Sequence, residues 1–549
     1  MPEVRPCDTS VLVVGAGPVG ITLALDLASR GIDVTVAEIR HRGEPPSPKC
    51  NHISARSMEI FRRLGVAKDV RNAGLPPDYP NDVAYRITTT GLELSRIPIP
   101  SRQKRYTATG GPDTWWPTAE PPHRANQIFF EPVLIERAYA TPKLHMRNRT
   151  RVEDVAQDQD GVTATLTDLD TGEAFTLRAR YLVGCDGGRS AIRRKIGAAF
   201  VGDEVVQRVQ STYVRAPRLL GLLKAPPAWG TFSLNPRRCG NVYAIDGRET
   251  WLIHNYVNAD DESFDSVDRD WAIRTILGVG PEFDYEVLSK EDWIGRRLVA
   301  DRLRDRRIFI CGDAAHIWVP FAGYGMNAGI ADAANLAWML AAHLQGWAGE
   351  AILNAHEAER LPITEQVSRY AMNHAIALAK QRGAVPADIE AAGPKGDAKR
   401  AALGRAAYDL NVQQYCCGGL NFGTFYDRSP IIAYDGTPQP AYTMDTFTPS
   451  TVPGCRTPHV WLAGGRSLYD AMGDGFALLR LDPAIDVSPL QAAAAARGML
   501  LNVVDLGRAE AGAAYTEALV LSRPDQHVAW RGDVLPDDPV RLIAKVTGG

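Results

Sequence analysis

The first forty residues alternate between apolar runs and one amphipathic stretch. Residues 10–14 form a run of β-branched residues and leucine, which is typical of a strand buried on both faces of a parallel sheet. Residues 19–30 carry apolar positions at the spacing of one helix face, and residues 33–38 form a second apolar run. The pattern therefore predicts a strand–helix–strand unit at the N-terminus.

The rest of the chain divides into β-rich and helical stretches. The pattern predicts helices over residues 54–64 and 128–139, a β-meander over 151–182, a largely β region over 205–295, a strand over 307–311 and a helical tract over about 325–410. A mixed α/β pattern starts afresh near residue 425, which predicts a separate C-terminal domain. Because 549 residues are too many for one hydrophobic core, about two to four domains are expected.

Composition and charge exclude several classes of protein. A net charge of -3 gives no reason to expect nucleic acid or an anionic membrane as a partner. No apolar run approaches the roughly 20 residues of a membrane span. The eight cysteines include no Cys-x-x-Cys pair, so neither a metal site nor a redox dithiol is indicated. Unpatterned thiols and the absence of a basic, apolar leader predict a cytoplasmic protein.

A glycine-rich turn joins the first predicted strand to the first predicted helix. Its Gly-x-Gly-x-x-Gly spacing permits a tight turn, close approach of a pyrophosphate and packing of the helix on the strand. Glu38 follows about 20 residues later, where a carboxylate binds ribose hydroxyls and disfavours a 2′-phosphate. This site therefore suits FAD or NAD better than NADP. The alternative is a glycine-rich turn that binds no cofactor. The predicted cofactor-binding residues here are Gly15, Gly17, Pro18, Val19, Gly20 and Glu38.

A second candidate segment begins at Gly312-Asp313, directly after the strand predicted over 307–311. An aspartate at the end of a strand can accept hydrogen bonds from ribityl hydroxyls. The glycines that follow permit close approach of a flat ring, and the helix beginning near Met326 offers unpaired amides to an anionic flavin edge. A glycine-rich helix start without a ligand is the alternative. The predicted cofactor-binding residues are Gly312, Asp313, Pro320, Gly323, Gly325, Met326 and Asn327.

A third segment has the same strand, Asp-Gly and helix pattern, with Asp186-Gly187 and Ser190. Taken alone, it is better explained as an ordinary turn with an N-capping serine. In order along the chain, however, the three segments resemble the dinucleotide, Asp-Gly and Gly-Asp motifs of the single-component FAD-dependent aromatic hydroxylases, the p-hydroxybenzoate hydroxylase-like class. The resemblance adds Asp186 to the predicted cofactor-binding residues.

The resemblance covers nearly the whole chain and is to the branch that includes phenol, 2,4-dichlorophenol, 2-hydroxybiphenyl and polyketide hydroxylases. Pro453-Gly454-Cys455-Arg456 and Arg523-Pro524-Asp525 resemble signatures of that branch's C-terminal domain. It implies an α/β fold with a Rossmann-like FAD-binding domain, a β-sheet substrate domain and a C-terminal thioredoxin-like domain. The expected boundaries are 1–78, 105–190 and 296–395 for the FAD-binding domain, 79–104 and 191–295 for the substrate domain, 396–424 for a helical linker, and 425–549 for the C-terminal domain.

The resemblance also implies a reaction. NAD(P)H, which has no domain of its own, reduces FAD, and the reduced flavin captures O₂ as a C4a-hydroperoxide that hydroxylates a phenolic ring. Oxygenation of a polycyclic, antibiotic-like substrate remains an alternative. So do a flavin oxidase or dehydrogenase without oxygen insertion and an FAD-binding protein without turnover. The oligomeric state is open, and the resemblance allows a homodimer.

The resemblance assigns four further residues. Arg56 resembles the family arginine near the flavin and pyrophosphate, and Gln127 the glutamine beside the ribityl chain. Tyr324 is expected beside the flavin and is a candidate catalytic residue. His52 lies about one helical turn before Arg56 and is the candidate catalytic base, since an unperturbed histidine titrates near pH 6.5 and could accept a phenol proton. A histidine bonded to a loop carbonyl is the alternative for His52.

Overall fold

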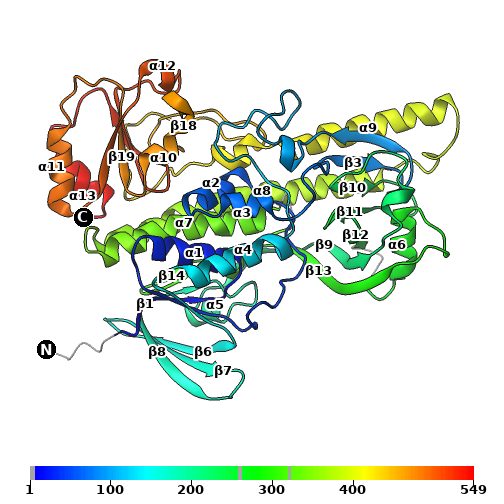
Figure 1. Ribbon diagram of the computed structural model, residues 1–549, viewed down its shortest axis with the longest axis horizontal. Helices are drawn as coiled ribbons and strands as arrows, with labels where there is room; N and C mark the ends of the chain where they lie inside the picture. Colours follow the sequence, from blue (N-terminus) through cyan, green and yellow to red (C-terminus); the bar gives the residue numbers. More distant parts are fainter. Residues whose placement is uncertain (1–6, 258–262, 320–322) are drawn as a thin grey trace.

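The computed structural model describes residues 7–257, 263–319 and 323–549 (Figure 1). Within these ranges the strands form two sheets of eight strands, one sheet of four and a two-stranded ribbon of β17 and β18. In Figure 1 the first large sheet lies below α1 and α7, the second lies to the right, and the four-stranded sheet of the C-terminal part of the chain lies at the upper left. No helix among the described residues is long and apolar enough to cross a membrane.

The first sheet has the strand order β14-β15-β8-β1-β2-β5, and the hairpin β6–β7 extends from β8. Its strands are β1 (Thr9–Val14), β2 (Val34–Ala37), β5 (Leu144–Arg147), β6 (Thr150–Gln157), β7 (Val162–Asp168), β8 (Ala174–Gly184), β14 (Arg304–Asp305) and β15 (Ile308–Ile310). β15, β8, β1, β2 and β5 run parallel, and β1 and β2 belong to the strand–helix–strand unit that the pattern predicts. The carboxyl ends of β1, β8 and β15 therefore meet at one edge, and all three candidate cofactor motifs begin there.

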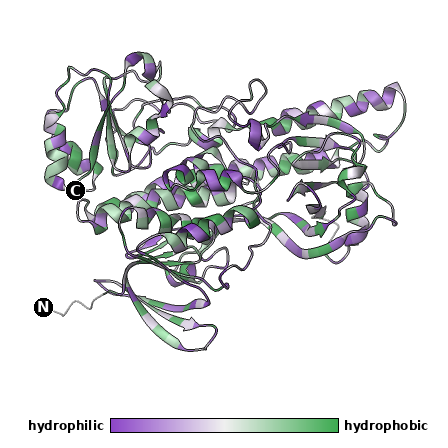
Figure 2. Cartoon of the chain, in the orientation of Figure 1, coloured by the Kyte–Doolittle hydropathy of each residue, from purple (hydrophilic) through white to green (hydrophobic). Residues whose placement is uncertain are grey.

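Helices pack on this sheet and on one another. They are α1 (Pro18–Ser29), α2 (Ala55–Arg63), α3 (Ala67–Asn72), α4 (Gln127–Ala140), α5 (Ala191–Lys195) and α7 (Tyr324–Leu344). Pro18 occupies the first turn of α1, where a missing N–H costs nothing, and Ser54 caps α2 by accepting a hydrogen bond from the Ser57 amide at 3.1 Å. α1 packs on α7, and both are largely apolar at the centre of the molecule (Figure 2).

The second sheet has the order β16-β13-β9-β12-β11-β10-β3-β4. Its strands are β3 (Val83–Arg86), β4 (Glu93–Ile97), β9 (Phe200–Arg215), β10 (Gly230–Ser233), β11 (Gly240–Ala244), β12 (Thr250–Val257), β13 (Glu286–Ala300) and β16 (His316–Ile317). Neighbours are antiparallel except β10 and β3. α6 (Arg269–Leu277) packs near β12. These strands fall mainly within the ranges expected for the substrate domain, whose boundaries remain a prediction.

The predicted helical tract divides into α7, α8 (Asn354–Gly383) and α9 (Pro394–Tyr415). α9 occupies much of the segment expected as a helical linker, residues 396–424, and packs on β4. A Cβ atom on Gly404 would lie 2.2 Å from the carbonyl oxygen of Leu94, so helix and strand meet backbone to backbone. This segment therefore packs against the second sheet.

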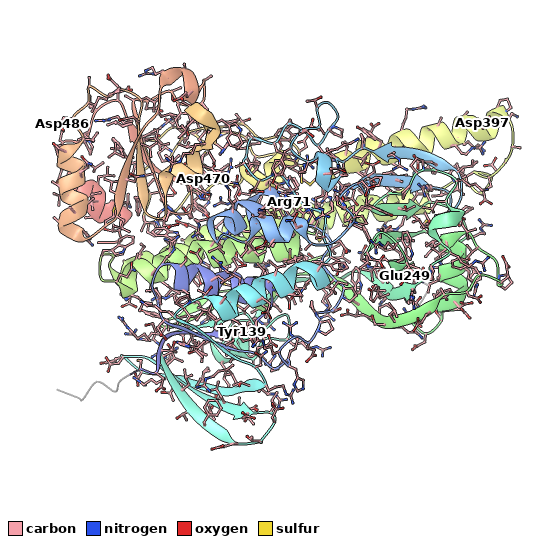
Figure 3. The ribbon with its side chains drawn as sticks, in the orientation of Figure 1. Arg71, Tyr139, Glu249, Asp397, Asp470 and Asp486 are labelled. Carbon is pink, nitrogen blue, oxygen red and sulfur yellow. The ribbon has the colours of Figure 1, made fainter. Side chains whose placement is uncertain are left out.

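The C-terminal sheet has the order β20-β19-β21-β22, with β19 and β20 parallel and the other pairs antiparallel. Its elements are β19 (Phe476–Arg480), α11 (Ser488–Arg497), β20 (Leu501–Asp505), α12 (Arg508–Ala511), β21 (Leu519–Ser522), β22 (Val528–Gly532) and α13 (Pro539–Val546), preceded by β17 (Trp461–Leu462), β18 (Arg466–Ser467) and α10 (Leu468–Met472). This order and these directions are those of a thioredoxin-like fold. Asp470 in α10 (Figure 3) forms an ion pair with Arg62 of α2 at 2.8 Å, which joins the domain to the FAD-binding part.

Candidate functional site

The glycines of the first turn have different surroundings. Gly15 has φ +101°, and a Cβ atom there would lie 2.5 Å from the carbonyl oxygen of Cys185. A Cβ atom on Gly20 would lie 2.0 Å from the Gly15 carbonyl oxygen. A Cβ atom on Gly17, by contrast, would meet nothing within 4 Å. Chain packing thus explains Gly15 and Gly20, whereas Gly17 leaves free space at the N-terminus of α1, as a bound pyrophosphate requires.

Glu38 lies at the end of β2, beside this turn. Its Oε2 accepts a hydrogen bond from the Ala16 amide at 2.7 Å, and its Oε1 accepts one from the Arg40 amide at 2.9 Å. The Arg40 guanidinium also donates to Glu131 at 2.7 Å, and Gln127 donates to the other oxygen of Glu131 at 2.5 Å. Glu38, Arg40 and Glu131 line a small cavity of about 70 Å³. Arg40 and Glu131 thus link Gln127 to Glu38, and the cofactor contacts expected of these two residues remain predictions.

The Gly312-Asp313 turn is held by a buried ion cluster. Asp332 on α7 accepts hydrogen bonds from the Gly312 amide at 3.2 Å, from Nε2 of His316 at 2.7 Å and from Nε of Arg360 at 2.7 Å. Burial raises the pKa of Asp332, but the charges of Arg360 and His316 outweigh it, so this pKa lies below its usual value. His316 thus has a structural contact, and the cluster fixes the loop that presents Asp313.

Asp313 has different surroundings from Asp332. Its side chain has no hydrogen-bond or ion-pair partner within the described ranges, and it lines a cavity of about 240 Å³ between the two large sheets. Burial deep in the molecule raises the pKa of Asp313, although its surface is open to the cavity. The carboxylate therefore faces the cavity with its acceptor oxygens unused by the described residues. Hydroxyl groups of a ligand would satisfy it.

The start of α7 forms another part of the cavity wall. Gly323 has φ +68°, and a Cβ atom there would lie 2.9 Å from Cβ of His52. Gly325 and Met326 line the cavity, whereas Asn327 links α7 to the His52 segment. Its Nδ2 donates to the His52 carbonyl at 3.0 Å, and its Oδ1 accepts from the Ser54 amide at 2.9 Å. Asn327 therefore positions His52. Pro320, like Ala322, lies outside the described residues.

Val19 and Gly329 account for how closely α1 and α7 pack. A Cβ atom on Gly329 would lie 2.6 Å from Cγ2 of Val19, and one on Gly312, where φ is +62°, would lie 3.0 Å from the same atom. The Val19 side chain is thus a packing group that brings the two cofactor motifs together.

Aromatic side chains dominate the remaining cavity wall. They are contributed by β10 to β13, by the loops beside them and by the end of α9, and comprise Trp229, Phe232, Tyr243, Tyr256, Trp293, Trp318 and Tyr415. A second cavity of about 220 Å³ shares Lys49, His254, Trp293 and Trp318 with the first. Flat, apolar surfaces with few polar groups suit an aromatic ligand.

His52 lies in the cavity wall and is 4 % exposed. Arg124, itself 2 % exposed, donates a hydrogen bond from its guanidinium to Nδ1 of His52. Burial and the charge of Arg124 hold the pKa of His52 well below its usual value. His52 is therefore neutral at neutral pH. His52 also has a hydrogen bond with the backbone of His123, in the segment that pairs with Ile53, so the loop contact expected as the alternative is present beside the arginine.

Two models of protein families match the chain. An FAD-binding domain matches residues 8–371, and the C-terminal domain of aromatic-ring hydroxylases matches residues 450–547. The chain belongs to the FAD-dependent aromatic-ring hydroxylases. The residues present fit the cofactor of that family, because Gly17 leaves room for a pyrophosphate and the unpartnered Asp313 faces the cavity.

Known relatives of this hydroxylase match it over almost their full length. FAD-dependent monooxygenase apdD of Emericella nidulans is 30% identical, over 98% of this chain and 90% of the relative. Tetracenomycin B2 monooxygenase-dioxygenase of Streptomyces olivaceus is 30% identical, over 97% of both chains. Among solved structures, the rebeccamycin biosynthetic enzyme RebC with reduced flavin is 36% identical with a TM-score of 0.88, over 99% of both chains.

Three predicted site residues of this hydroxylase have other contacts. Tyr324 points into an apolar cluster with Ile363, Val367 and Leu420, and burial raises its pKa well above the usual value. This placement gives no support to the predicted catalytic role beside the flavin. Asp186 accepts hydrogen bonds from Ser190 at 2.5 Å and from the Ala191 amide at 2.7 Å. Its carboxylate thus caps α5, the ordinary turn favoured for this segment taken alone.

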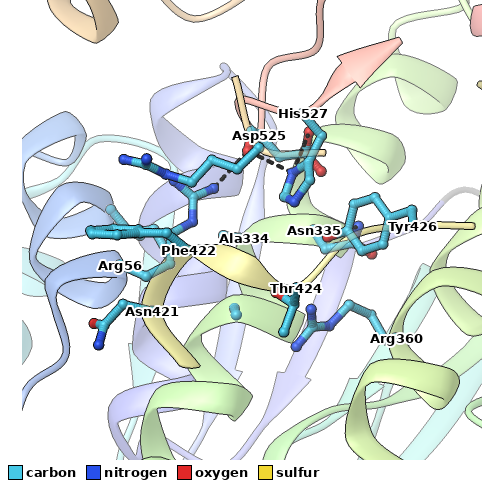
Figure 4. A pocket seen from close by; sticks show the side chains of 13 residues that line it. Arg56, Ala334, Asn335, Arg360, Asn421, Phe422, Thr424, Tyr426, Asp525 and His527 are labelled. Atoms are coloured by element: carbon cyan, nitrogen blue, oxygen red, sulfur yellow. Dashed lines mark hydrogen bonds and ion pairs between the residues drawn. The ribbon is translucent and has the colours of Figure 1, made fainter. Parts of the chain in front are cut away.

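Arg56 is the third of these residues. Its guanidinium donates to the Asp525 carbonyl at 2.6 Å, to Gln526 and to Glu59 at 3.2 Å. Figure 4 shows it at a small pocket beside Asp525 and His527 of the C-terminal domain. These contacts make Arg56 an interface residue, and its predicted place beside the flavin and pyrophosphate is not supported by them.

Sequence reasoning missed Arg124 and Asp332. Neither stands in a recognisable motif: Arg124 lies in a Pro- and polar-rich stretch, and Asp332 follows the glycine segment on a helix. Only their contacts with His52 and with Gly312 reveal their importance. An isolated charged residue within an apolar helix, as Asp332 is in α7, was the one available signal.

Proposed function

We propose that this flavoprotein hydroxylates a phenolic aromatic ring with electrons from NAD(P)H and one oxygen atom from O₂. The observation that carries the proposal is the aromatic cavity, which includes both Asp313 and the start of α7 in its wall. The Gly17 turn and Glu38 would hold the ADP half of FAD. Asp313 and the amides of the α7 N-terminus would hold the flavin half.

When bound, FAD supplies the electron transfer and the activation of oxygen. The protein's own contribution is to position the ring and exclude water. Trp229, Phe232 and Tyr415 offer flat apolar surfaces that would hold an aromatic ring in place. Burial of this wall keeps water away from the reacting atoms.

A polycyclic phenol is the second candidate substrate, and the adjoining cavity favours it. His254 and Trp293 belong to both cavities, so a ligand longer than one ring could extend past them. Two similar proteins support a polycyclic substrate by their names. One is the monooxygenase-dioxygenase named for tetracenomycin B2, and the other is aklavinone-11 hydroxylase, whose structure is titled as a complex with FAD and aklavinone.

A substrate screen tests the proposal. Simple phenols and hydroxylated polycyclic aromatics would each be added to the holoenzyme with NADH or NADPH. The proposal predicts that at least one aromatic compound stimulates NAD(P)H oxidation and becomes hydroxylated. A flavin oxidase would instead form H₂O₂ without a hydroxylated product, and a protein without turnover would show no stimulation.

A further inference from the structure

Gln526 has a backbone conformation that favours glycine. It lies in the hairpin between β21 and β22, where its amide donates to the Arg523 carbonyl at 2.9 Å and the register of the two strands shifts. Its φ of +62° is in the left-handed region, which is unfavourable for residues other than glycine. Hairpins of this kind usually have glycine at the left-handed position. A glutamine there points to a task of its side chain that glycine could not perform.

The Gln526 side chain is bound to Arg56 of α2. It is 8 % exposed, and its Oε1 accepts a hydrogen bond from Nη1 of Arg56. The Asp525 carbonyl accepts a second bond from the same guanidinium, at 2.6 Å. Because a guanidinium only donates, the amide oxygen of Gln526 and not its amide nitrogen must face Arg56. Two acceptors from one hairpin of the C-terminal domain therefore hold the first turn of α2.

These bonds join two domains at a place where they do not pack closely. A cavity of about 40 Å³ lies beside Arg56, and its lining includes Ile60 of α2 and His527 of the C-terminal domain. Figure 4 shows Arg56 and His527 at this pocket. Glu59 of α2 accepts hydrogen bonds from Arg56 at 3.2 Å and from Arg456 of the C-terminal domain. Polar contacts therefore fix this side of α2, where close packing is interrupted.

The chain before α2 forms part of the aromatic cavity wall. Cys50, Asn51 and His52 line that cavity, and Ser54 is the N-cap of α2. Only Ile53 separates His52 from the cap. Packed interiors transmit small displacements, so a shift of the first turn of α2 would move the backbone of the cavity wall.

We propose that Gln526 is a positioning residue for the aromatic cavity: through Arg56 it fixes the first turn of α2, and α2 fixes the wall formed by residues 50–52. Small displacements of the groups that hold a substrate slow its reaction, and a looser wall admits water. Without the Gln526 bond, more of the electrons from NAD(P)H should end in H₂O₂ and fewer in hydroxylated product. This consequence rests on the proposed function, whereas the effect on the wall does not.

Three substitutions separate the side-chain bond of Gln526 from its unfavourable backbone. Gln526→Met keeps the size and the backbone cost but loses the acceptor, Gln526→Gly loses both, and Gln526→Glu keeps an acceptor oxygen. Gln526→Gly should resist denaturant better than Gln526→Met, because glycine adopts this φ freely. Arg306→Gly is the matched control, since Arg306 has φ +51° and is exposed in the turn between β14 and β15.

Hydrogen exchange of the FAD-loaded protein, followed by mass spectrometry, measures how firmly the wall is held. In Gln526→Met and Gln526→Gly, the amides of residues 51–58 should exchange about tenfold faster than in the parent, because a bond to a charged group is lost. Exchange in β1 and β19 should not change. Gln526→Glu should stay within about twofold of the parent, and Arg306→Gly should equal it.

Turnover provides the second readout. With an aromatic compound that stimulates NAD(P)H oxidation, the product formed per NAD(P)H should fall about twofold or more in Gln526→Met and Gln526→Gly, and Gln526→Glu should restore it. If Gln526→Met does not fold, Gln526→Gly and Gln526→Glu decide the matter.

Several results would contradict the proposal. They are unchanged exchange of residues 51–58 in Gln526→Gly, a uniform increase of exchange over the whole chain, an unchanged yield of product per NAD(P)H, or no restoration by Gln526→Glu. Failure of the proposed function would appear separately, as the absence of any stimulating aromatic compound, and the exchange measurement would still test the position of the wall.

Discussion

Gly20 approaches Gly15 so closely that a Cβ atom on Gly20 would lie 2.0 Å from the Gly15 carbonyl oxygen. The same turn leaves Gly17 with open space around the position of its absent Cβ. One motif therefore combines a residue that the fold requires with a residue that only a ligand requires.

Two alanine substitutions separate these requirements. Gly17→Ala should fold normally, because its φ of -68° suits any residue, but should bind FAD tenfold or more weakly, a loss of at least about 1.4 kcal/mol. Gly20→Ala should lower the stability of the apoprotein by about 1–3 kcal/mol or more, since backbone must move. Flavin release by fluorescence and denaturant unfolding of the FAD-free protein measure the two effects. Equal stability losses in both variants would contradict this division.

Asp313 should matter to the cofactor more than to the fold. Because its carboxylate has no partner within the described ranges, Asp313→Ala removes no hydrogen bond from the protein. The variant should unfold at nearly the parent's denaturant concentration when both lack FAD. It should release FAD more readily during gel filtration. A variant that retains FAD as well as the parent does would exclude the ribityl assignment.

Asp332 provides the comparison with Asp313, because the stability of the fold should depend on its carboxylate. Asp332→Asn breaks a buried ion cluster with Arg360 and His316, and such losses cost about 3–5 kcal/mol. The sign of its pH dependence follows from the lowered pKa. The carboxylate stabilises the folded state above the unfolded-state pKa of about 3.9, and this stabilisation is lost as the pH falls below it. Urea unfolding from neutral to acid pH should therefore show a steeper loss for the parent than for Asp332→Asn.

The C-terminal domain should act through its buried contacts and not through thiol chemistry. Burial raises the pKa of Cys455 to about 12, so Cys455→Ser should leave turnover intact. Arg523, by contrast, is fully buried and donates to Glu359 of α8 at 2.8 Å. Arg523→Met should cost about 3–5 kcal/mol of stability because it leaves Glu359 charged and buried. Loss of activity in Cys455→Ser with FAD still bound would overturn this view.

The elements that local pattern determines could be predicted from the sequence. The glycine turn, β1, β2 and Glu38 belong to one short unit, so their spacing alone places them together. Side-chain direction could not be predicted in the same way. Tyr324 and Gly325 are neighbours, yet one faces an apolar cluster and the other the cavity, because successive residues of a helix point about 100° apart.

Contacts between segments that are distant in the chain could not be predicted from the sequence either. Arg56 bonds to a loop some 470 positions along the chain, and Arg124 meets His52 through the folding of two loops. These contacts also change what is expected of His52. A histidine at this position suggests a base, but burial and the charge of Arg124 hold the pKa of His52 well below its usual value.

The central claim is that this chain inserts oxygen into an aromatic ring. Its most direct test is turnover of an aromatic compound that stimulates NAD(P)H oxidation, carried out under ¹⁸O₂ and followed by mass spectrometry of the product. The account predicts a hydroxylated product with one ¹⁸O atom from O₂, and the other atom in water. A product whose new oxygen comes from water, or H₂O₂ as the sole oxygen-derived product with every such compound, would contradict it.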